Sequence, residues 1–599
     1  MSRGGLLVVL VVLAILYPPV ALLMERGPVA AFQFFATDAF TYLAVARHSQ
    51  GNNFFTFDGT HPINGFHPLW QWTLSGLAAL GDPDDQEFLL MGAFLLGLAL
   101  ATAGLACFAL AVLDLTGSFA AALLAAVPGW YYLGFALLEP QFGSSWSFVN
   151  GMESPLSICL FGILILFLVR CDVFGRAGRG RLLLLSCLLT LLTLARLDDG
   201  FLLLPPLVLI LLTSAWAGRR GEGLLVFLAV PVAVLGAFLA YNQIRAGSLL
   251  PLSGLVKGGL GLWENLRCLV YTLLPNPVIR SETGFAWKEI AYRTVQLWAP
   301  MVVAALWLAR PAAGGGQGGQ VVSGAVDSPD ATPAEPGWLP VRWVADPDSR
   351  LLFVLSGYVL LKGLYNLVNV LMVHTGPWYF AGSILVFNLL AARALAPVLV
   401  PVERGRPAGE RPSPLAAAAG GATPPACTRE GGPGALGLGL AVVALVLVQA
   451  NGFGRLKWNT DYNHHLYRFW ANREAITAGL TAAVPGSGVL EFDDGIFSFS
   501  LGVPVLHGFC FAGDRDLFAA RGRGELFKLA WERGFRVFAT LAYLTRPLPS
   551  TLDQATLDAI CRNEFQRSGE RSGPWRFTVA WRDPVTQVTF IRFDPASGN

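Results

Sequence analysis

The stretch "LLVVLVVLAILYPPVALLM", residues Leu6 to Met24, decides the fold class. It carries no charge, and it is close to the roughly 20 apolar residues that an α-helix needs to cross a bilayer. Arg3 precedes it, as a positive residue precedes a signal peptide, but the apolar run is long and no small-residue cleavage site follows. Because more apolar runs come after it, we predict a retained first membrane helix.

The composition of the whole chain supports this prediction. Hydrophobic residues make up 54% of its 599 residues, charged residues only 14%, and the mean hydropathy is +0.54. These values predict a protein that crosses a membrane many times. A net charge of +2 gives no indication of nucleic acid. The eight cysteines form no CxxC or Cys/His cluster, which argues against zinc, although Cys510 and Cys561 could pair if their region is exported.

Hydropathy predicts an all-α polytopic membrane domain of about 11 to 12 helices, followed by a C-terminal α/β soluble domain. Trp70 to Leu80 is a further run of about half the length needed to cross. The predicted membrane helices after the first are Phe88 to Leu113, Phe119 to Leu138, Pro155 to Val169, Arg181 to Ala195, Phe201 to Ala217, Gly223 to Tyr241, Leu297 to Leu308, Leu351 to Val373, Trp378 to Val400 and Ala435 to Ala450.

Arginine-rich loops predict the orientation, because Lys and Arg gather on the cytoplasmic side. The cytoplasmic loops are then "RCDVFGRAGRGR" from Arg170, "GRRGE" around Arg219, and the linker after Val402. The exported segments are Asn150 to Glu153, Arg196 to Asp199, Asn242 to Gln296, and His374 to Pro377. The loop at 25–69 and the segment Asn150 to Glu153 are both predicted on the exported side, so an even number of membrane crossings must lie between them. The predicted segments give an even number only if Trp70 to Leu80 or Phe119 to Leu138 does not cross fully.

These patterns divide the chain into two domains. Residues 1–452 form the membrane domain, with an exported loop at 25–69 and disordered, Gly/Ala/Pro-rich cytoplasmic loops at about 311–341 and 403–434. Residues 453–599 form the soluble domain, since hydropathy falls there and alternation appears in "RFTVAW" and "TQVTFIRF". This domain is exported if the last membrane helix runs outward.

The first exported loop is unusually rich in polar residues. In "ATDAFTYLAVARH", from Ala36, Thr37 is predicted to cap an interfacial amphipathic helix with Asp38 in its first turn. An acid there could serve only to complement the helix dipole. The following "NNFFTFDGTHPINGFHPLW" adds further polar and aromatic residues in one short segment, which is more than a simple connection needs. These residues are Asp58, His61, Asn64, His67 and Trp70.

Six motifs in order, "DAFTYLAVAR", "FTFDG", "NGFHPLW", "NGMESPL", "ARLDDGF" and "YNQIRAGSLLPLSGLVK", resemble a branch of the bacterial GT-C glycosyltransferases. That superfamily includes protein O-mannosyltransferases, aminoarabinose transferases of lipid A and arabinofuranosyltransferases. The tail segment "VLEFDDGIFSFSLGVPVLHG" is also similar to this branch. The chain departs from it at Thr37, where the branch has an acid paired with the next one, and at Ile63, where the branch has a threonine.

The resemblance implies an inverting glycosyltransferase of the inner membrane. It would move a sugar from a polyprenyl-phosphate-linked donor to a glycan, lipid or protein acceptor of the cell envelope at the exported face. Asp38 is the expected general base, with Glu153 as a second catalytic carboxylate. Expected substrate-binding residues are Asn64, His67, Arg196, Asp198, Lys257, His374, Trp378 and Tyr379. Arg196 or Lys257 would bind the lipid phosphate. Neither a cofactor nor a metal is expected, since the carboxylates lack ligand-like spacing.

Structural roles explain several of these residues equally well. Glu153 could simply begin a helix, Arg196 could pair with a neighbouring aspartate at a helix end, and Trp378 and Tyr379 could belong to an aromatic interface belt. Two other functions also stay open. A flippase or transporter of lipid-linked sugar would hold polar residues at membrane depth, although no inverted repeat is evident. A non-catalytic, glycan-binding assembly subunit would fit the missing acid at position 37.

Overall fold

The computed structural model describes residues 2–126, 149–175, 178–213, 218–257, 261–273, 287–309, 346–370, 377–399, 460–492, 495–508, 513–539, 554–555, 557, 571 and 575–596. The two Gly/Ala/Pro-rich loops and the predicted helix Ala435 to Ala450 lie outside these residues. So do His374, Cys510 and Cys561.

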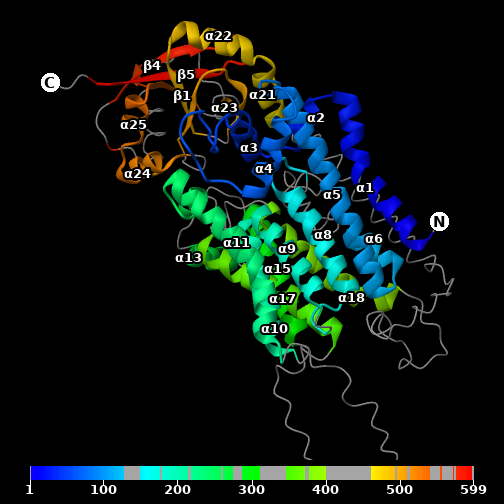
Figure 1. The fold of residues 1–599 in the computed structure, drawn as a ribbon. Helices are drawn as coiled ribbons and strands as arrows, with labels where there is room; N and C mark the ends of the chain where they lie inside the picture. Colours follow the sequence, from blue (N-terminus) through cyan, green and yellow to red (C-terminus); the bar gives the residue numbers. More distant parts are fainter. Residues whose placement is uncertain are drawn as a thin grey trace, which may run out of the picture.

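Helices form most of the described chain, and a small sheet lies at one end of the helical bundle (Figure 1). Among the described residues, four helices are long and apolar enough to cross a membrane: α1 (Arg3–Arg26), α5 (Gln86–Thr116), α11 (Arg220–Ala246) and α17 (Pro347–Asn369). The other helices in and beside the bundle are α2 (Val29–Phe34), α3 (Thr37–His48), α4 (Pro68–Ala78), α6 (Phe119–Ala126), α8 (Ser154–Arg170), α9 (Arg179–Ala195), η3 (Leu197–Leu203), α10 (Leu204–Leu212), α12 (Leu252–Lys257), α13 (Leu262–Leu273), α15 (Trp287–Ala309), η6 (Pro377–Phe380) and α18 (Ala381–Leu399).

Helices α5 and α8 pack against one another with almost no side chain between their backbones. A Cβ atom added at Gly104 would lie 2.5 Å from the Cα atom of Cys159, and one added at Gly162 would overlap the carbonyl oxygen of Gly104. Small residues at such a crossing let two helices approach closely where the solvent is lipid. At the end of the same pair, Arg170 binds Asp114, with 2.8 Å between Nε and Oδ2.

Most predicted apolar runs coincide with helices, and the differences have local causes. The run from Phe201 begins in the 3-10 turn η3, and α10 then continues for only 9 residues. Helix α4, within the run Trp70 to Leu80, is too short to cross a bilayer. Its 11 residues span about 16 Å at 1.5 Å per residue, roughly half a bilayer core. Ser118 follows α5 at the end of the bundle that holds Arg170, whereas Asn150 lies at the other end, where its carbonyl oxygen accepts from the amide of Ala36.

The C-terminal part contains a five-stranded sheet in the order β2-β1-β3-β5-β4. Strands β1 (Gly488–Glu491), β2 (Val505–His507) and β3 (Phe535–Ala539) are parallel, and β4 (Trp575–Arg582) and β5 (Thr589–Pro595) are antiparallel. The helices here are α21 (Thr460–Ala471), α22 (Arg473–Ala483), α23 (Ile496–Ser500), α24 (Arg515–Arg523) and α25 (Leu526–Glu532). This mixture agrees with the predicted α/β character.

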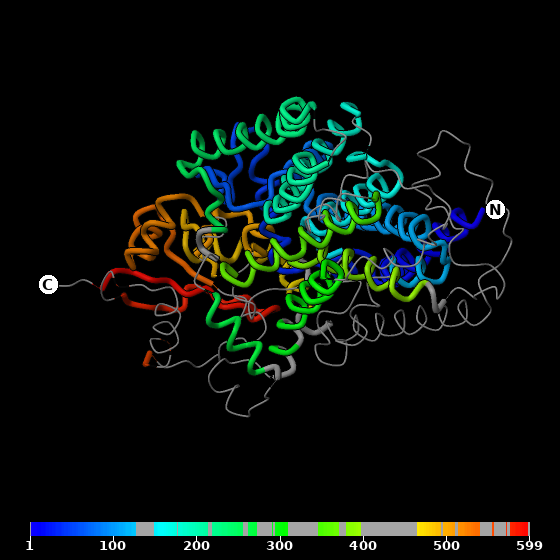
Figure 2. The backbone as a smooth tube through the Cα atoms, turned by 90° about the horizontal axis from the view of Figure 1, so that it is seen from below, coloured from blue at the N-terminus to red at the C-terminus, as the bar shows by residue number. Residues whose placement is uncertain are grey.

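The sheet region packs directly on the chain's first loop, and in Figures 1 and 2 the two lie side by side. The guanidinium of Arg47 donates to the carbonyl oxygen of Phe499 at 3.1 Å. The indole of Trp470 donates to Gln86 at 3.0 Å, and Gln86 donates in turn to the carbonyl oxygen of Ser500. The rings of Phe40 and Phe499 lie 5.8 Å apart. These contacts join the two ends of the sequence in one core.

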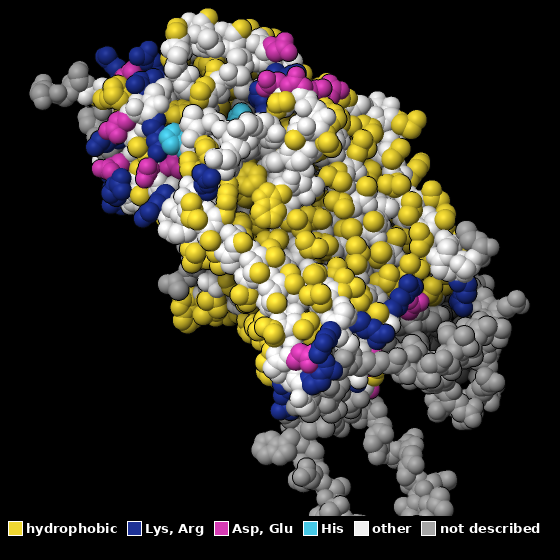
Figure 3. Space-filling view, viewed as in Figure 1, with side chains coloured by type: hydrophobic (Ala, Val, Ile, Leu, Met, Phe, Trp, Pro, Cys, Tyr) yellow, Lys and Arg dark blue, Asp and Glu magenta, His cyan; other side chains and the backbone are white. Residues whose placement is uncertain are grey.

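The surface is divided along the length of the molecule (Figure 3). Hydrophobic side chains cover the middle, over helices such as α1, α5 and α11, and charged side chains gather at the two ends. One charged end is the sheet region. At the other end lie Arg170, the last residue of α8, Arg179, the first of α9, and Arg219, which precedes α11. An apolar belt between two polar ends is the arrangement expected of a protein that sits across a bilayer.

Candidate active site

Asp38 lies in the first turn of α3, and the helix differs from the prediction in two ways. It begins at Thr37, so Ala36 rather than Thr37 is the N-cap residue. It is also largely buried in the protein and not exposed along one face, with Phe40, Leu43 and Ala44 among its buried residues. Helices α4 and α23 both pack on α3, and Gly495, which precedes α23, lies close to the backbone of Thr41. Asp38 itself stays partly exposed.

Glu153 and Arg196 form a buried ion pair at the site. Glu153 is the N-cap residue of α8, and Arg196 follows the last residue of α9. Their side chains are 1% and 3% exposed, and Arg196 Nη1 lies 2.7 Å from Glu153 Oε1. The hydroxyl of Tyr42 donates to the other carboxylate oxygen of Glu153 at 3.1 Å. The guanidinium carbon of Arg196 also lies 4.9 Å from the centre of the Tyr379 ring, a cation–π contact.

His67 completes this group from the start of α4. The amide of Leu197 donates to His67 Nδ1 at 3.2 Å, so that nitrogen carries no proton and the neutral ring is protonated on Nε2. Nε2 lies 3.6 Å from Glu153 Oε1. Burial lowers the pKa of His67, and although Glu153 opposes that effect the lowered pKa favours the same neutral form.

A second charged layer lies behind Arg196, where Asp198 and Asp199 follow it in η3. Arg196 Nε lies 2.9 Å from Asp198 Oδ1. Lys362 of α17, whose side chain is fully buried, lies 3.2 Å from Asp198 and 2.5 Å from Asp199. Asp199 also accepts hydrogen bonds from Tyr358 and Ser157. Buried charges are tolerated when they are paired and hydrogen-bonded in this way.

These groups meet at one pocket of about 80 Å³. It brings together Asp38, Glu153, His67, Arg196 and Tyr379, five of the ten residues that the sequence suggested. The remaining lining residues are Thr41, Tyr42, Gly65, Phe66, Met152, Leu197, Ser253 and His507. The pocket therefore has two carboxylates, two imidazoles and one guanidinium, and they come from segments that are far apart in the sequence.

The other suggested residues lie elsewhere or cannot be placed. Asp198 lies behind Arg196. Asn64 is buried and holds the backbone after α11: it donates to the carbonyl oxygens of Ser248 and Leu250 and accepts from the amide of Leu252. Lys257 is the last residue of α12 and Trp378 lies in η6, but their side chains are outside the description, as is His374.

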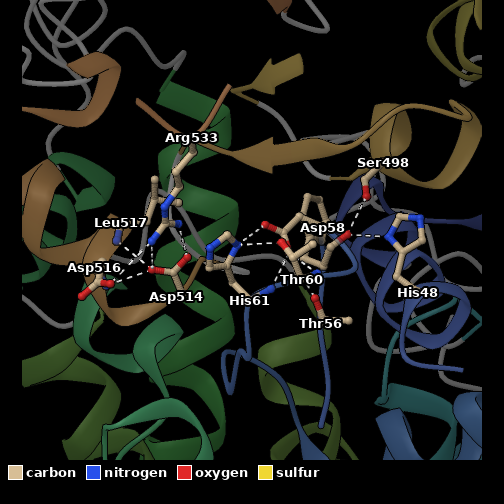
Figure 4. Close-up of polar contacts among 11 residues, drawn as sticks. His48, Thr56, Asp58, Thr60, His61, Ser498, Asp514, Asp516, Leu517 and Arg533 are labelled. Carbon is tan, nitrogen blue, oxygen red and sulfur yellow. Dashed lines mark hydrogen bonds and ion pairs between the residues drawn. The ribbon is translucent and has the colours of Figure 1, made fainter. Parts of the chain in front are cut away.

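Asp58 and His61 do not line this pocket, and they join the first loop to the sheet region instead (Figure 4). His61 Nδ1 lies 2.6 Å from Asp58 Oδ2, and two backbone amides also donate to Asp58. Burial disfavours the charged carboxylate, but these hydrogen bonds prevail and lower the pKa of Asp58 to about 2. The hydrogen bond to Asp58 raises the pKa of His61, and Asp514 and Arg533 of the sheet region also act on this imidazole.

Three polar residues around the site were missed in the sequence: Tyr42, Lys362 and His507. Lys362 could have been found, because it is the one charged residue in the predicted membrane helix Leu351 to Val373, and a charge at such a position is a functional candidate by itself. Tyr42 and His507 lie inside the motifs "DAFTYLAVAR" and "VLEFDDGIFSFSLGVPVLHG", but neither residue was singled out there as part of a site. Among the described residues, no group of three or more His, Cys, Asp or Glu side chains could hold a metal ion.

The fold and site together define a mostly helical protein with membrane-length apolar helices, and with a buried, charged pocket where a small C-terminal sheet meets the bundle. No protein-family model matches the chain, and no curated protein matches it. Among solved structures, the chain is similar to the crystal structure of ArnT from Cupriavidus metallidurans in the apo state. The two are 13% identical, the match covers 96% of this chain and 97% of that chain, and the TM-score is 0.44. A likeness of this degree does not determine the activity, so the functional argument rests on the site.

Proposed function

We propose that the protein is a membrane glycosyltransferase of the GT-C type, which moves a sugar from a polyprenyl-phosphate donor to an acceptor of the cell envelope. One observation supports this most: Asp38, Glu153, Arg196 and Tyr379, from four separate segments, line the same pocket at one end of the membrane bundle. A carboxylate, a cation and an aromatic face are the groups that transfer from a sugar phosphate needs.

Asp38 has the general-base role in this proposal. It is partly exposed in a pocket whose other carboxylate, Glu153, is held by Arg196 and Tyr42. The acceptor hydroxyl attacks the anomeric carbon, the bond from that carbon to the phosphate oxygen breaks, and the hydroxyl proton passes to Asp38. The polyprenyl phosphate leaves with its negative charge, near the guanidinium of Arg196.

Glu153 has a positioning role. Its carboxylate binds Arg196 at 2.7 Å and accepts from Tyr42, and Tyr42 lies one turn after Asp38 on α3. Glu153 therefore orients both Arg196 and helix α3, which carries Asp38. This role differs from that of the second catalytic carboxylate expected from the sequence.

The exported side of the membrane is the proposed location of the pocket. Arg170, Arg179 and Arg219 lie at the opposite end of the bundle, and arginines favour the cytoplasm. A pocket at the exported side would meet cell-envelope acceptors directly.

The test is Asp38→Asn, which keeps the size of the side chain and removes the proton acceptor. Purified protein in proteoliposomes is given a panel of radiolabelled polyprenyl-phosphate monosaccharides and a cell-envelope extract, and label in the extract is counted. Transfer by Asp38→Asn should fall by about two to four orders of magnitude. Binding of undecaprenyl phosphate should not change.

Asp82→Asn is the matched control, because Asp82 is an exposed aspartate in the loop before α5 and does not line the pocket. It should transfer as the wild type does. Near wild-type transfer by Asp38→Asn would show that Asp38 only begins a helix. If the wild type moves the labelled lipid across the bilayer without cleaving it, the protein is a transporter and the proposed function is wrong.

A further inference from the structure

We propose that His507 is an acceptor-binding residue of this pocket, so that the C-terminal sheet supplies part of the site. The inference rests on the proposed glycosyltransferase function and extends it to the acceptor. Among the described lining residues, His507 is the one that comes from the C-terminal part of the chain. Nothing in the sequence motifs or in the comparisons assigns it a role.

The position of His507 in the sheet is typical of a ligand-binding residue. It is the last residue of β2, and its register partner on the parallel strand β1 is Glu491, the last residue there. Side chains of register partners project to the same face, so a carboxylate stands beside the imidazole. Both residues are almost fully buried, at 1% and 0% exposure. Ligands of open sheets with parallel strands bind at the carboxyl ends of those strands, which is where these two residues lie.

The link between β1 and β2 fixes His507 relative to Asp38. This link contains α23, which packs on α3, and Gly495 approaches the backbone of Thr41 so closely that no side chain would fit. Ser498 donates to the carbonyl oxygen of Phe57 at 3.1 Å (Figure 4). The ring of Phe57 then meets the imidazole of His507 edge-on, with 5.3 Å between the ring centres. The histidine and the helix that carries the base are therefore held as one unit.

Chemistry assigns His507 to the acceptor and not to the donor. The donor phosphate is an anion, and the pocket's guanidinium is Arg196, which is held in the bundle by Glu153 and Asp198. The acceptor group is a neutral hydroxyl that must be held while its proton leaves. An imidazole can donate and accept hydrogen bonds, which suits a hydroxyl. His507 would orient the acceptor oxygen, and Asp38 would take the proton.

The experiment compares His507→Ala and His507→Gln with the wild type in the proteoliposome assay. The rate of transfer is measured against the concentration of envelope extract, alongside release of free sugar to water and binding of undecaprenyl phosphate. The extract concentration for half-maximal rate should rise about tenfold in His507→Ala, as expected for one lost hydrogen bond. Lipid binding and release of sugar to water should stay within about twofold.

His464→Gln is the matched control, since His464 is an exposed histidine on α21 and does not line the pocket. It should leave all three measurements unchanged. The inference is wrong if both His507 variants keep the wild-type dependence on extract. It is also wrong if they lose lipid binding and transfer equally, because His507 would then serve the donor or the fold.

Failure of the proposed function would look different. In that case the wild type itself would transfer no label from any donor, whereas failure of this inference leaves wild-type transfer intact. His507→Gln adds a further distinction, because glutamine keeps a hydrogen-bond donor and an acceptor. Partial recovery of the extract dependence in His507→Gln relative to His507→Ala is expected of a residue that binds a hydroxyl, and its absence would contradict the inference.

Discussion

At the scale of single residues, the charged layer around Arg196 determines how the site is held. Glu153, Asp198 and Asp199 carry three negative charges, and Arg196 and Lys362 carry two positive ones. All five side chains are at most 14% exposed. Removing either cation therefore leaves a buried carboxylate without its ion-pair partner, which costs more than the pair contributes.

Replacing Lys362 by Met should lower the free energy of unfolding by about 3 to 5 kcal/mol, because Asp199 then stays buried with hydroxyl donors alone. The measurement is the thermal midpoint of the detergent-solubilised protein, monitored by size-exclusion chromatography.

The double variant Lys362→Met/Asp199→Asn should recover part of this loss, since the amide removes the unpaired charge and can still accept from Tyr358 and Ser157. A double variant no more stable than Lys362→Met would show that the lysine acts through packing and not through charge.

The sequence predicted the members of this layer unevenly. Arg196, Asp198 and Glu153 stood out because charges between apolar runs are rare, and their residue types suggested a site. The pairing of Arg196 with a neighbouring aspartate was among the expectations, and Asp198 is that partner. The pairing with Glu153 could not be predicted, because Arg196 and Glu153 are 43 residues apart and meet only when α8 and α9 pack. Asn64 was predicted to bind substrate, but its side chain holds a backbone loop instead.

At the scale of helices and strands, the sequence located most elements because apolar runs of membrane length are strong signals. Helix α3 illustrates what hydropathy cannot predict. Its start was predicted within one residue, but its surroundings were not, because its burial depends on α23, more than 450 positions later in the sequence. Hydropathy shows that a segment will be removed from water, but it does not identify which other segment will pack on it.

The crossing of α5 and α8 yields a prediction at this scale. Gly104→Val and Gly162→Val should each destabilise the protein by about 1 to 3 kcal/mol or more, because the added atoms meet backbone that cannot move aside. The measurement is the yield and thermal midpoint of the solubilised protein.

Gly236→Val is the matched control, since Gly236 lies in the membrane-length helix α11 and no atom lies within 4 Å of an added Cβ there. It should fold as the wild type does. Equal loss in all three variants would mean that valine disturbs insertion into the membrane and not the contact between the two helices.

At the scale of the whole molecule, the arginines and the pocket lie at opposite ends, so the orientation can be tested with two residues. On a background without the eight native cysteines, Gly522→Cys and Gly221→Cys are treated with an impermeant maleimide in intact spheroplasts. Both positions are exposed, and nothing lies within 4 Å of an added Cβ at either. Gly522→Cys should react, and Gly221→Cys should react only after the membrane is made permeable. The reverse pattern would place the pocket in the cytoplasm.

The close contact of the two ends of the sequence also has a consequence in time. The hydrogen bond from Arg47 to Phe499 joins residues 452 positions apart. At roughly 5 to 20 residues per second, a ribosome needs about 20 to 90 seconds to make the intervening chain. During that interval the segment that carries Asp38 has no covering sheet, and its phenylalanines are open to other surfaces. Maturation of the pocket is thus among the last events in the biosynthesis of the protein, and a chain that stalls before residue 500 would display an unfinished site to the cell's quality-control proteases.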